Sequence, residues 1–195
     1  MTSVSAFLGG PSYRPPTMTE EETPDLRPLV IHRDQRGSVR EAFRSSWYPD
    51  MPPIVQVVHS ESRGGVMRAM HAHAKQFDVW HFTQGKAQVQ LYDHRDGFWS
   101  NLYVEADTTL VIPPGISHGF LALTPVTLTY YLTREYDGTD EFEWNAWDRA
   151  FPGAAEWKAG PDPSFFLGMV QEWYIQSDRD KNAPSLEQFA ETFPA

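Results

Sequence analysis

The sequence predicts a mainly β protein, built as a sandwich or barrel of short strands. Between residues 29 and 136, short runs of β-type composition are separated by Gly, Pro and Asp, which is typical of such folds. In the segment 86–92, Ala87, Val89 and Leu91 alternate with polar residues. This strand should therefore be half-buried, with its apolar face against the core.

The chain divides into an arm and one domain. Residues 1–27 are rich in Gly, Pro, Thr and Glu without periodicity, so we expect a flexible N-terminal arm that is disordered or borrowed by a neighbouring chain. Residues 28–195 should form a single domain, because a chain of 195 residues suits one core. The other expected strands are 54–59, 66–71, 79–83, 108–112 and 127–132.

Turn and cap residues mark the ends of several elements. Residues 93–97 and the Pro-Pro-Gly sequence at 113–115 supply turns. Beyond Trp144 the sequence is loop-like and aromatic, until Ser185 and Gln188 form a capping-box pattern. This pattern predicts one short C-terminal helix.

The composition favours a folded protein in which any charged ligand is bound by local groups rather than by the overall charge. The chain is 41% hydrophobic and 14% aromatic, which is ample for a core, and its net charge is −10. A protein this acidic has no general attraction for nucleic acid or an anionic membrane, so a phosphate must be held by local groups. Without Cys, a metal would depend on His and carboxylates. No signal peptide or membrane span is evident, so we expect a cytoplasmic protein.

Two motifs with histidines resemble those of cupins. Gly65, His71, His73, Asp78 and Gly85 have the spacing of the first cupin motif, with Asp where Glu is usual, and residues 113–118 resemble the second. Two histidines separated by one residue leave the same face of a strand. Three imidazoles and one carboxylate, from His71, His73, Asp78 and His118, could bind one divalent transition metal.

A wider set of motifs resembles the dTDP-4-dehydrorhamnose 3,5-epimerase family. In chain order they are 34–37 with Glu41 and Phe43, Gln56, 65–71, 112–120, Tyr130 and Tyr136, 144–145, and 177–184. The resemblance covers residues 29–190 and implies a cupin double-stranded β-helix, or jelly roll, in a homodimer without a metal cofactor. It also implies epimerisation at C3, C5 or both of a nucleotide-linked 4-keto-6-deoxy sugar, with dTDP as the expected nucleotide.

The same resemblance suggests roles for individual residues. His71 would remove a proton next to the C4 ketone, Asp180 would be its partner, and Tyr130 would return a proton from the opposite face. A carboxylate on one imidazole nitrogen fixes the tautomer and raises the basicity of the ring. The expected substrate-binding residues are Arg36 and Arg68 for the diphosphate, Gln56 for the sugar or nucleotide, and Glu41, His118 and Tyr136 around the pocket.

One position departs from the family pattern. The family has a Lys that stabilises the enolate oxygen, where this chain has Asp78. A carboxylate near an enolate destabilises it. Lys75 is a poor substitute, because three residues along an extended strand separate the side chains by roughly 10 Å and invert the face.

Three possibilities therefore remain open. In the first, which we favour, His71 is a free base paired with Asp180, and Asp78 hydrogen-bonds to a neighbour such as His73. In the second, the four-residue metal set binds an ion that replaces the missing Lys as a Lewis acid, in an isomerase or oxygenase. In the third, the chain is a non-catalytic cupin that binds sugar.

Overall fold

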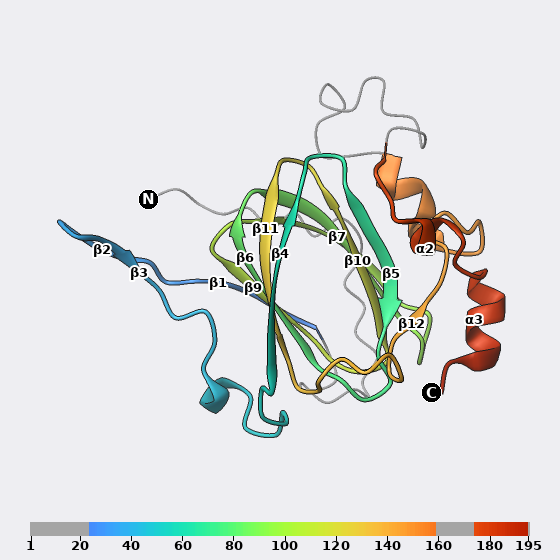
Figure 1. Ribbon diagram of the computed structural model, residues 1–195, viewed down its shortest axis with the longest axis horizontal. Coiled ribbons are helices and arrows are strands. Elements are labelled where there is room, and N and C mark those ends of the chain that lie inside the picture. Colours follow the sequence, from blue (N-terminus) through green and yellow to red (C-terminus); the bar gives the residue numbers. More distant parts are fainter. Residues whose placement is uncertain (1–23, 159–173, 195) are drawn as a thin grey trace.

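Two five-stranded antiparallel sheets face each other at the centre of the molecule (Figure 1). The computed structural model describes residues 24–158 and 174–194. In order of neighbouring strands, the first sheet contains β1 (Asp25–Pro28), β9 (Thr108–Ile112), β6 (Asp78–Gln84), β11 (Val126–Leu132) and β4 (Gln56–Ser62). The second contains β12 (Phe142–Glu143), β5 (Met67–Ala72), β10 (Ile116–Ala122), β7 (Lys86–Asp93) and β8 (Trp99–Glu105). The predicted mainly β fold of a jelly roll is confirmed.

The six predicted strands are confirmed, with ends that differ by no more than three residues from β4, β5, β6, β7, β9 and β11. The sequence analysis missed β1, β2, β3, β8, β10 and β12. Every residue of β10 is buried, so its sequence lacks the alternation that reveals a strand with one exposed face. His118, which the sequence analysis predicted as a site residue, therefore lies on a strand that it did not predict.

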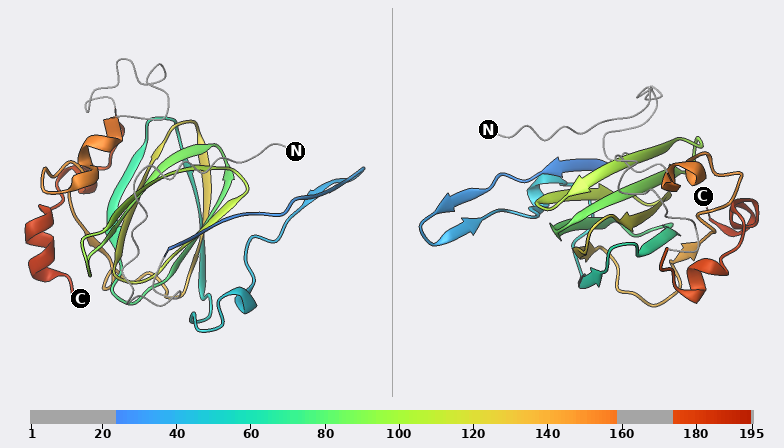
Figure 2. Two further views of the ribbon diagram at one scale, coloured as in Figure 1. Left: turned by 180° about the vertical axis from the view of Figure 1, so that it is seen from behind. Right: turned by 90° about the horizontal axis from the view of Figure 1, so that it is seen from above.

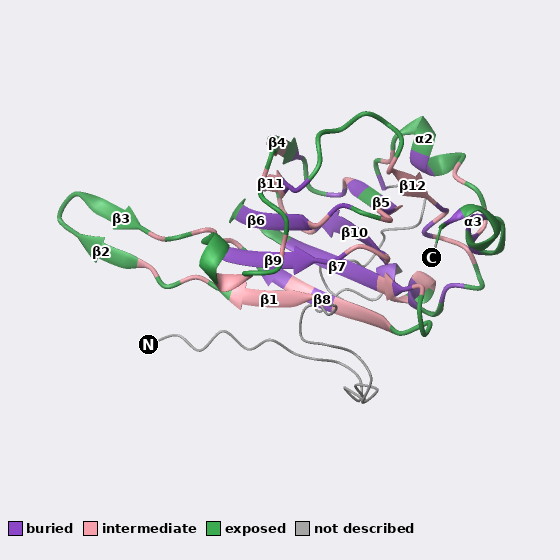
Figure 3. Cartoon of the chain, turned by 90° about the horizontal axis from the view of Figure 1, so that it is seen from below, coloured by how far each residue is buried: buried purple, intermediate pink, exposed green. Residues whose placement is uncertain are grey.

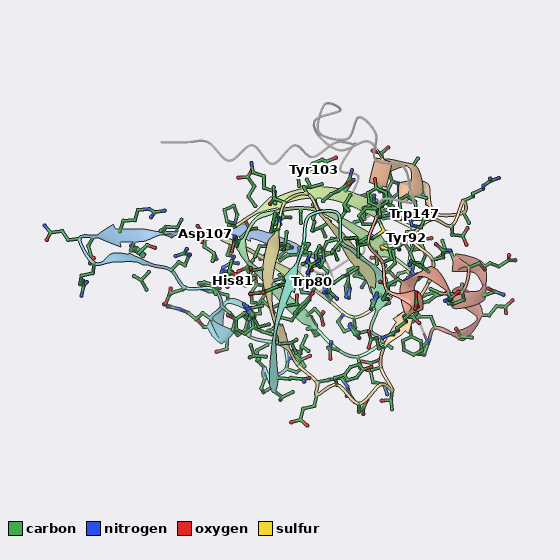
Figure 4. All side chains as sticks on the ribbon, turned by 45° about the horizontal axis from the view of Figure 1, so that its top comes forward. Trp80, His81, Tyr92, Tyr103, Asp107 and Trp147 are labelled. Carbon is green, nitrogen blue, oxygen red and sulfur yellow. The ribbon has the colours of Figure 1, made fainter. Side chains whose placement is uncertain are left out.

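Apolar side chains pack in part of the space between the two sheets. Trp80, Phe82 and Leu110 from the first sheet pack with Phe120 and Leu91 from the second, and all are buried. Figure 4 labels Trp80 near the middle of the barrel. This packing explains why the apolar face of β7 points inward.

The outer face of β7 is buried as well. Gln88 and Gln90 are 0% exposed, and their side-chain amides donate to the backbone carbonyl oxygens of Glu156 and Gly153, at 2.9 and 3.0 Å. These acceptors belong to η3 (Pro152–Lys158), which covers the outer face of the second sheet. The prediction of a half-buried strand is therefore wrong, and Figure 3 shows β7 buried along most of its length.

The C-terminal segment packs against the second sheet (Figure 1). It contains α2 (Asp178–Lys181) and α3 (Leu186–Thr192), and the capping box predicted at Ser185 and Gln188 begins α3. The predicted short C-terminal helix is confirmed as α3, whereas η3, α2 and the short η2 (Ser45–Trp47) were not predicted. In the described part of the chain, no helix has the length and apolar character needed to cross a membrane.

A hairpin of β2 (His32–Asp34) and β3 (Gly37–Val39) projects from the barrel (Figure 2). All its strand residues are exposed, as Figure 3 shows. Strand β1 precedes it and pairs with β9 from Asp25 onward, so the last residues of the predicted arm belong to the sheet. Residues 1–23 of that arm lie outside the described residues.

A β-bulge interrupts β5 opposite β10. His118 pairs with His71, but Phe120 pairs with Arg68, so three residues of β5 span two of β10. In a regular strand Arg68 and His71 would leave opposite faces, whereas a bulge re-aims the side chains beside it. A Cβ on Gly119 would lie 2.3 Å from the Ala69 Cβ, so the bulge requires glycine at this position.

Candidate active site

The barrel holds a cavity of about 230 Å³ between its two sheets. Its lining combines an apolar wall with a cluster of polar and charged groups. The lining residues are Val58, Arg68, His71, His73, Gln76, Asp78, Trp80, His118, Phe120, Tyr130, Leu132, Tyr136 and Glu141. A concave, mostly apolar cavity with a few convergent polar groups is typical of small-molecule sites.

His71 lies between two carboxylates. Its Nε2 is 3.1 Å from Asp180 Oδ1, and its Nδ1 is 3.0 Å from Glu141 Oε1. Asp180 is buried in α2 behind β5, and its backbone N–H donates to Ser177 Oγ, at 3.0 Å. Although burial lowers the pKa of His71, the hydrogen bonds to Asp180 and Glu141 outweigh it and raise the pKa to about 9.

Glu141 is a site residue that the sequence analysis missed. Its hydrogen bond with His71 is the main cause that lowers the pKa of Glu141 to about 2. Arg179 Nη1 lies 3.1 Å from the same carboxylate oxygen. Strand β12 pairs with β5 and places Glu143 opposite His71, and this pairing brings Glu141 to the pocket. The signal in the sequence was the acidic run that follows Tyr136, ending at Glu143.

Asp78 lies between two histidine rings without a hydrogen bond to either. His73 Nε2 is 3.7 Å from Asp78 Oδ1, and His118 Nε2 is 3.7 Å from Asp78 Oδ2, which is too long for a hydrogen bond. The carboxylate instead accepts from Gln76 Nε2 at 2.7 Å and Trp80 Nε1 at 3.1 Å. The prediction that Asp78 pairs with His73 through a hydrogen bond is therefore wrong.

The two histidines beside Asp78 are held by backbone carbonyls. His73 Nδ1 lies 2.5 Å from the Asp140 carbonyl oxygen, and His118 Nδ1 lies 3.0 Å from that of Ile116. The Asp140 side chain accepts from the backbone N–H groups of residues 74–76, which fixes the turn between β5 and β6. Burial lowers the pKa of His118 to about 4, so this ring is neutral near pH 7.

The structure separates the predicted four-residue metal set. Donor atoms of His73, Asp78 and His118 lie within 4.8 Å of one another. His71 belongs to a different group, with Asp180 and Glu143. His73, Asp78 and His118 all line the pocket, whereas Asp180 and Glu143 do not.

Tyr130 faces the pocket from the opposite sheet. Its hydroxyl accepts a hydrogen bond from Ser60 Oγ, at 3.3 Å, and its ring packs edge-on against Trp80, with centroids 5.6 Å apart. Burial raises the pKa of Tyr130 above its usual value. The phenol is therefore protonated at neutral pH.

The predicted substrate-binding residues divide into three groups. Arg68, His118 and Tyr136 line the pocket, and Tyr136 is 63% exposed. Gln56 does not line it, because its Oε1 accepts from the Tyr136 backbone N–H at 2.8 Å. Arg36 and Glu41 also lie outside the lining. The Arg36 side chain is 90% exposed on the β2–β3 hairpin, and Glu41 pairs with Arg44.

Comparisons with known proteins identify the family of the chain. The profile of the family described as dTDP-4-dehydrorhamnose 3,5-epimerase matches residues 26–188. The chain is 34% identical over 142 residues to the spore coat polysaccharide biosynthesis protein SpsL of Bacillus subtilis (strain 168), a match that covers 62% of this chain and 93% of SpsL.

Solved structures with the same fold include two epimerases. ChmJ, a 3'-monoepimerase from Streptomyces bikiniensis in complex with dTDP-quinovose, is 27% identical with a TM-score of 0.70, over 86% of this chain and 85% of ChmJ. The dTDP-4-dehydrorhamnose 3,5-epimerase from Elizabethkingia anophelis NUHP1 has a TM-score of 0.71 over 88% of this chain and 95% of that one. At 20% identity the latter shows the fold alone. The chain therefore belongs to the dTDP-4-dehydrorhamnose 3,5-epimerase family of the cupin superfamily and is an epimerase.

Proposed function

We propose that this epimerase inverts C3, C5 or both in a nucleotide-linked 4-keto-6-deoxy sugar, with a dTDP sugar as the first substrate to test. The observation that carries the proposal is the placement of His71 and Tyr130. They come from different sheets, on β5 and β11, and both line one pocket. Inversion requires that a proton leave one face of the carbon and return on the other, which two facing groups can do.

His71 serves as the base in this proposal. A base must be neutral, whereas His71 between two carboxylates is stabilised as the charged ring. Because Asp180 is buried behind the ring and Glu141 lines the pocket, the substrate takes the place of Glu141 beside His71. Asp180 then remains to orient the ring and to stabilise the imidazolium that forms.

Solvent deuterium exchange tests this assignment. The protein is incubated in D₂O with dTDP-4-keto-6-deoxyglucose, and deuterium at C3 and C5 is followed by NMR. His71→Ala should lower the exchange rate by roughly 10²–10⁴-fold, the usual cost of losing a general base. Exchange at the wild-type rate in folded His71→Ala would contradict the assignment of His71 as the base. No exchange in the wild-type protein with dTDP, UDP, GDP or CDP forms of the sugar would contradict the proposed function.

Substrate binding is proposed to involve two copies of the chain. Arg68 lines the pocket and supplies a planar guanidinium suited to diphosphate oxygens. Arg36 is too exposed on its hairpin to serve the pocket of its own chain, so we propose that it reaches the pocket of a partner in a homodimer. Large apolar side chains are exposed on the hairpin and just before it, at Val39 and Val30, and at the start of the edge strand β4, at Val55 and Val57. Such an exposed apolar surface suits a contact with a second chain.

Subunit mixing tests this arrangement. Arg36→Ala and His71→Ala proteins are each assayed alone and then after mixing under conditions that exchange subunits. If Arg36 acts in the partner's pocket, a mixed dimer has one intact site and activity returns. If activity stays at the level of the separate variants while light scattering shows mixed dimers, Arg36 does not act across the interface.

A further inference from the structure

We propose that His73, Asp78 and His118 bind one divalent first-row transition metal ion, whose charge takes the place of the family's missing Lys. Binding of the ion stands on the geometry of these residues alone. Its role in the reaction rests on the proposed function. His71 is not a ligand in this proposal, unlike in the four-residue set that the spacing suggested.

The first support is the convergence of the donor atoms. Both Nε2 atoms lie 3.7 Å from an oxygen of Asp78. Two ligands about 2.1 Å from one ion, at a tetrahedral angle, are about 3.4 Å apart. Two of the three donor pairs therefore have nearly the separation that a shared ion imposes, and all three donor atoms lie within 4.8 Å of one another. Two histidines and one carboxylate on one side of an ion, with the other positions open, form a recurrent catalytic metal site.

The second support is the hydrogen bonding of the rings. A carbonyl oxygen can only accept, so the Nδ1 atoms of His73 and His118 must donate to Asp140 and Ile116. When such a ring is neutral, its Nε2 carries the lone pair, which here faces the Asp78 carboxylate. Acceptors as close together as these repel each other unless a cation lies between them. A backbone carbonyl on the outer nitrogen is also the usual partner of a metal-binding histidine.

The third support is the environment of Asp78. Gln76 Nε2 and Trp80 Nε1 each donate to one of its oxygens, which fixes the carboxylate toward the two rings. Ligating carboxylates are commonly held in this way by outer partners. Gln76 and Trp80 also line the pocket, so the site is part of the cavity wall and the open positions of the ion face the substrate.

The position of the site suits the electrostatics of the reaction. Removal of a proton beside the C4 ketone places negative charge on the ketone oxygen, and Asp78 without a cation would oppose that charge. Lys75 does not line the pocket. A bound divalent ion supplies Lewis-acid polarisation of a carbonyl. Because His71 is not one of the three ligands, it keeps its contact with Asp180. The His71–Asp180 pair and the ion can therefore act together.

Metal binding by the isolated protein is the direct test. The protein is stripped with a chelator and titrated with Co²⁺ alone and with Zn²⁺ alone, by calorimetry and, for Co²⁺, by its visible absorption. We expect one ion per chain with both methods. His73→Ala and Asp78→Asn should weaken Co²⁺ binding by more than the roughly 10–100-fold that loss of an outer partner costs. A metal-induced rise in Tm, lost in the same variants, gives a second measurement for variants of low stability.

Two control variants distinguish this site from its alternatives. His59→Ala removes an exposed histidine outside the pocket and should leave the affinity for Co²⁺ unchanged. His71→Ala should also bind one Co²⁺, because His71 is not a ligand. No binding by the wild-type protein, binding unaffected by His73→Ala and Asp78→Asn, or binding lost in His71→Ala would overturn the proposed site.

Activity assays separate this inference from the proposed function. If the stripped enzyme exchanges solvent deuterium at the full rate, the ion has no role in the reaction, although the enzyme remains an epimerase. If exchange falls on stripping and returns with one metal, the role is supported. The protein could also bind one Co²⁺ at His73, Asp78 and His118 without incorporating solvent deuterium into any nucleotide sugar. That result would support the metal site and contradict the proposed substrate class.

Discussion

His71 Nε2 contacts Asp180 Oδ1 at 3.1 Å across a sequence separation of 109 residues. The contact requires α2 to pack behind β5, so the base and its partner come together only when the C-terminal segment covers the barrel. The second carboxylate, Glu141, lies on the pocket side of the same ring. The two carboxylates therefore have different expected effects on catalysis, and separate variants can distinguish them.

Asp180→Asn should give a folded enzyme with much lower turnover. The amide keeps the shape of Asp180 but cannot stabilise the imidazolium that forms when His71 takes a proton. The loss should be roughly 10²–10⁴-fold in kcat, measured by product formation, with circular dichroism as the check on folding. The exposed Asp178→Asn in the same helix is the matched control and should be near wild type. Wild-type turnover in Asp180→Asn would mean that the contact is only structural.

Glu141→Gln should shift the pH dependence of kcat/KM. In the free enzyme His71 has a pKa of about 9, so kcat/KM should rise with pH by about tenfold per unit until that value is reached. Glu141→Gln removes the carboxylate charge that, together with its hydrogen bond, raises this pKa. The rising part of the pH profile of kcat/KM, its rising limb, should therefore move to lower pH in Glu141→Gln.

The exposed Glu135→Gln, in the same loop, is the control for that shift, because it makes the same change of charge outside the pocket. Its rising limb should coincide with that of the wild type. A limb that stays in place in Glu141→Gln would show that Glu141 does not set the protonation of His71.

Much of the fold was predictable because its strands alternate or carry turn residues at their ends. Ala87, Val89 and Leu91 alternate with polar residues and revealed β7, although its outer face is also buried, whereas β10 has no such alternation. His71 and Asp180 came from motifs that resemble the family. Glu141 could not be found in this way, since it reaches His71 through β12, which has only two residues and no detectable period.

The bulge in β5 also could not be predicted from the sequence. Period-two alternation places Arg68 and His71 on opposite faces, and only the unequal pairing with β10 brings both to the pocket. A single local irregularity thus decides whether the proposed diphosphate ligand and the proposed base share a site. Gly119, across from the bulge, makes that irregularity possible.

Gly119→Ala should destabilise the protein and impair the site together. Its Cβ would lie 2.3 Å from Ala69 Cβ and 2.7 Å from Ala69 Cα, so β5 must move. Overpacking of this kind typically costs about 1–3 kcal/mol, measured by denaturant unfolding. Gly64→Ala is the control, because its nearest atoms are at 3.7 Å, and its unfolding free energy should change by about 0.5 kcal/mol or less. Equal stability and equal kcat/KM in both variants would contradict the role of Gly119.

Tyr130→Phe should separate proton removal from inversion. The phenol of Tyr130 is held protonated in the pocket by burial, opposite His71, and Phe keeps the ring that packs against Trp80 while removing the acid. His71 can still take and return a proton on its own face, so deuterium should enter the sugar while its configuration is retained. NMR of the reaction in D₂O reports both quantities on one sample. Tyr136→Phe is the matched control: Tyr136 also lines the pocket but is 63% exposed, so solvent can replace its hydroxyl and inversion should persist. If Tyr136→Phe gives exchange without inversion and Tyr130→Phe inverts normally, the acid is Tyr136.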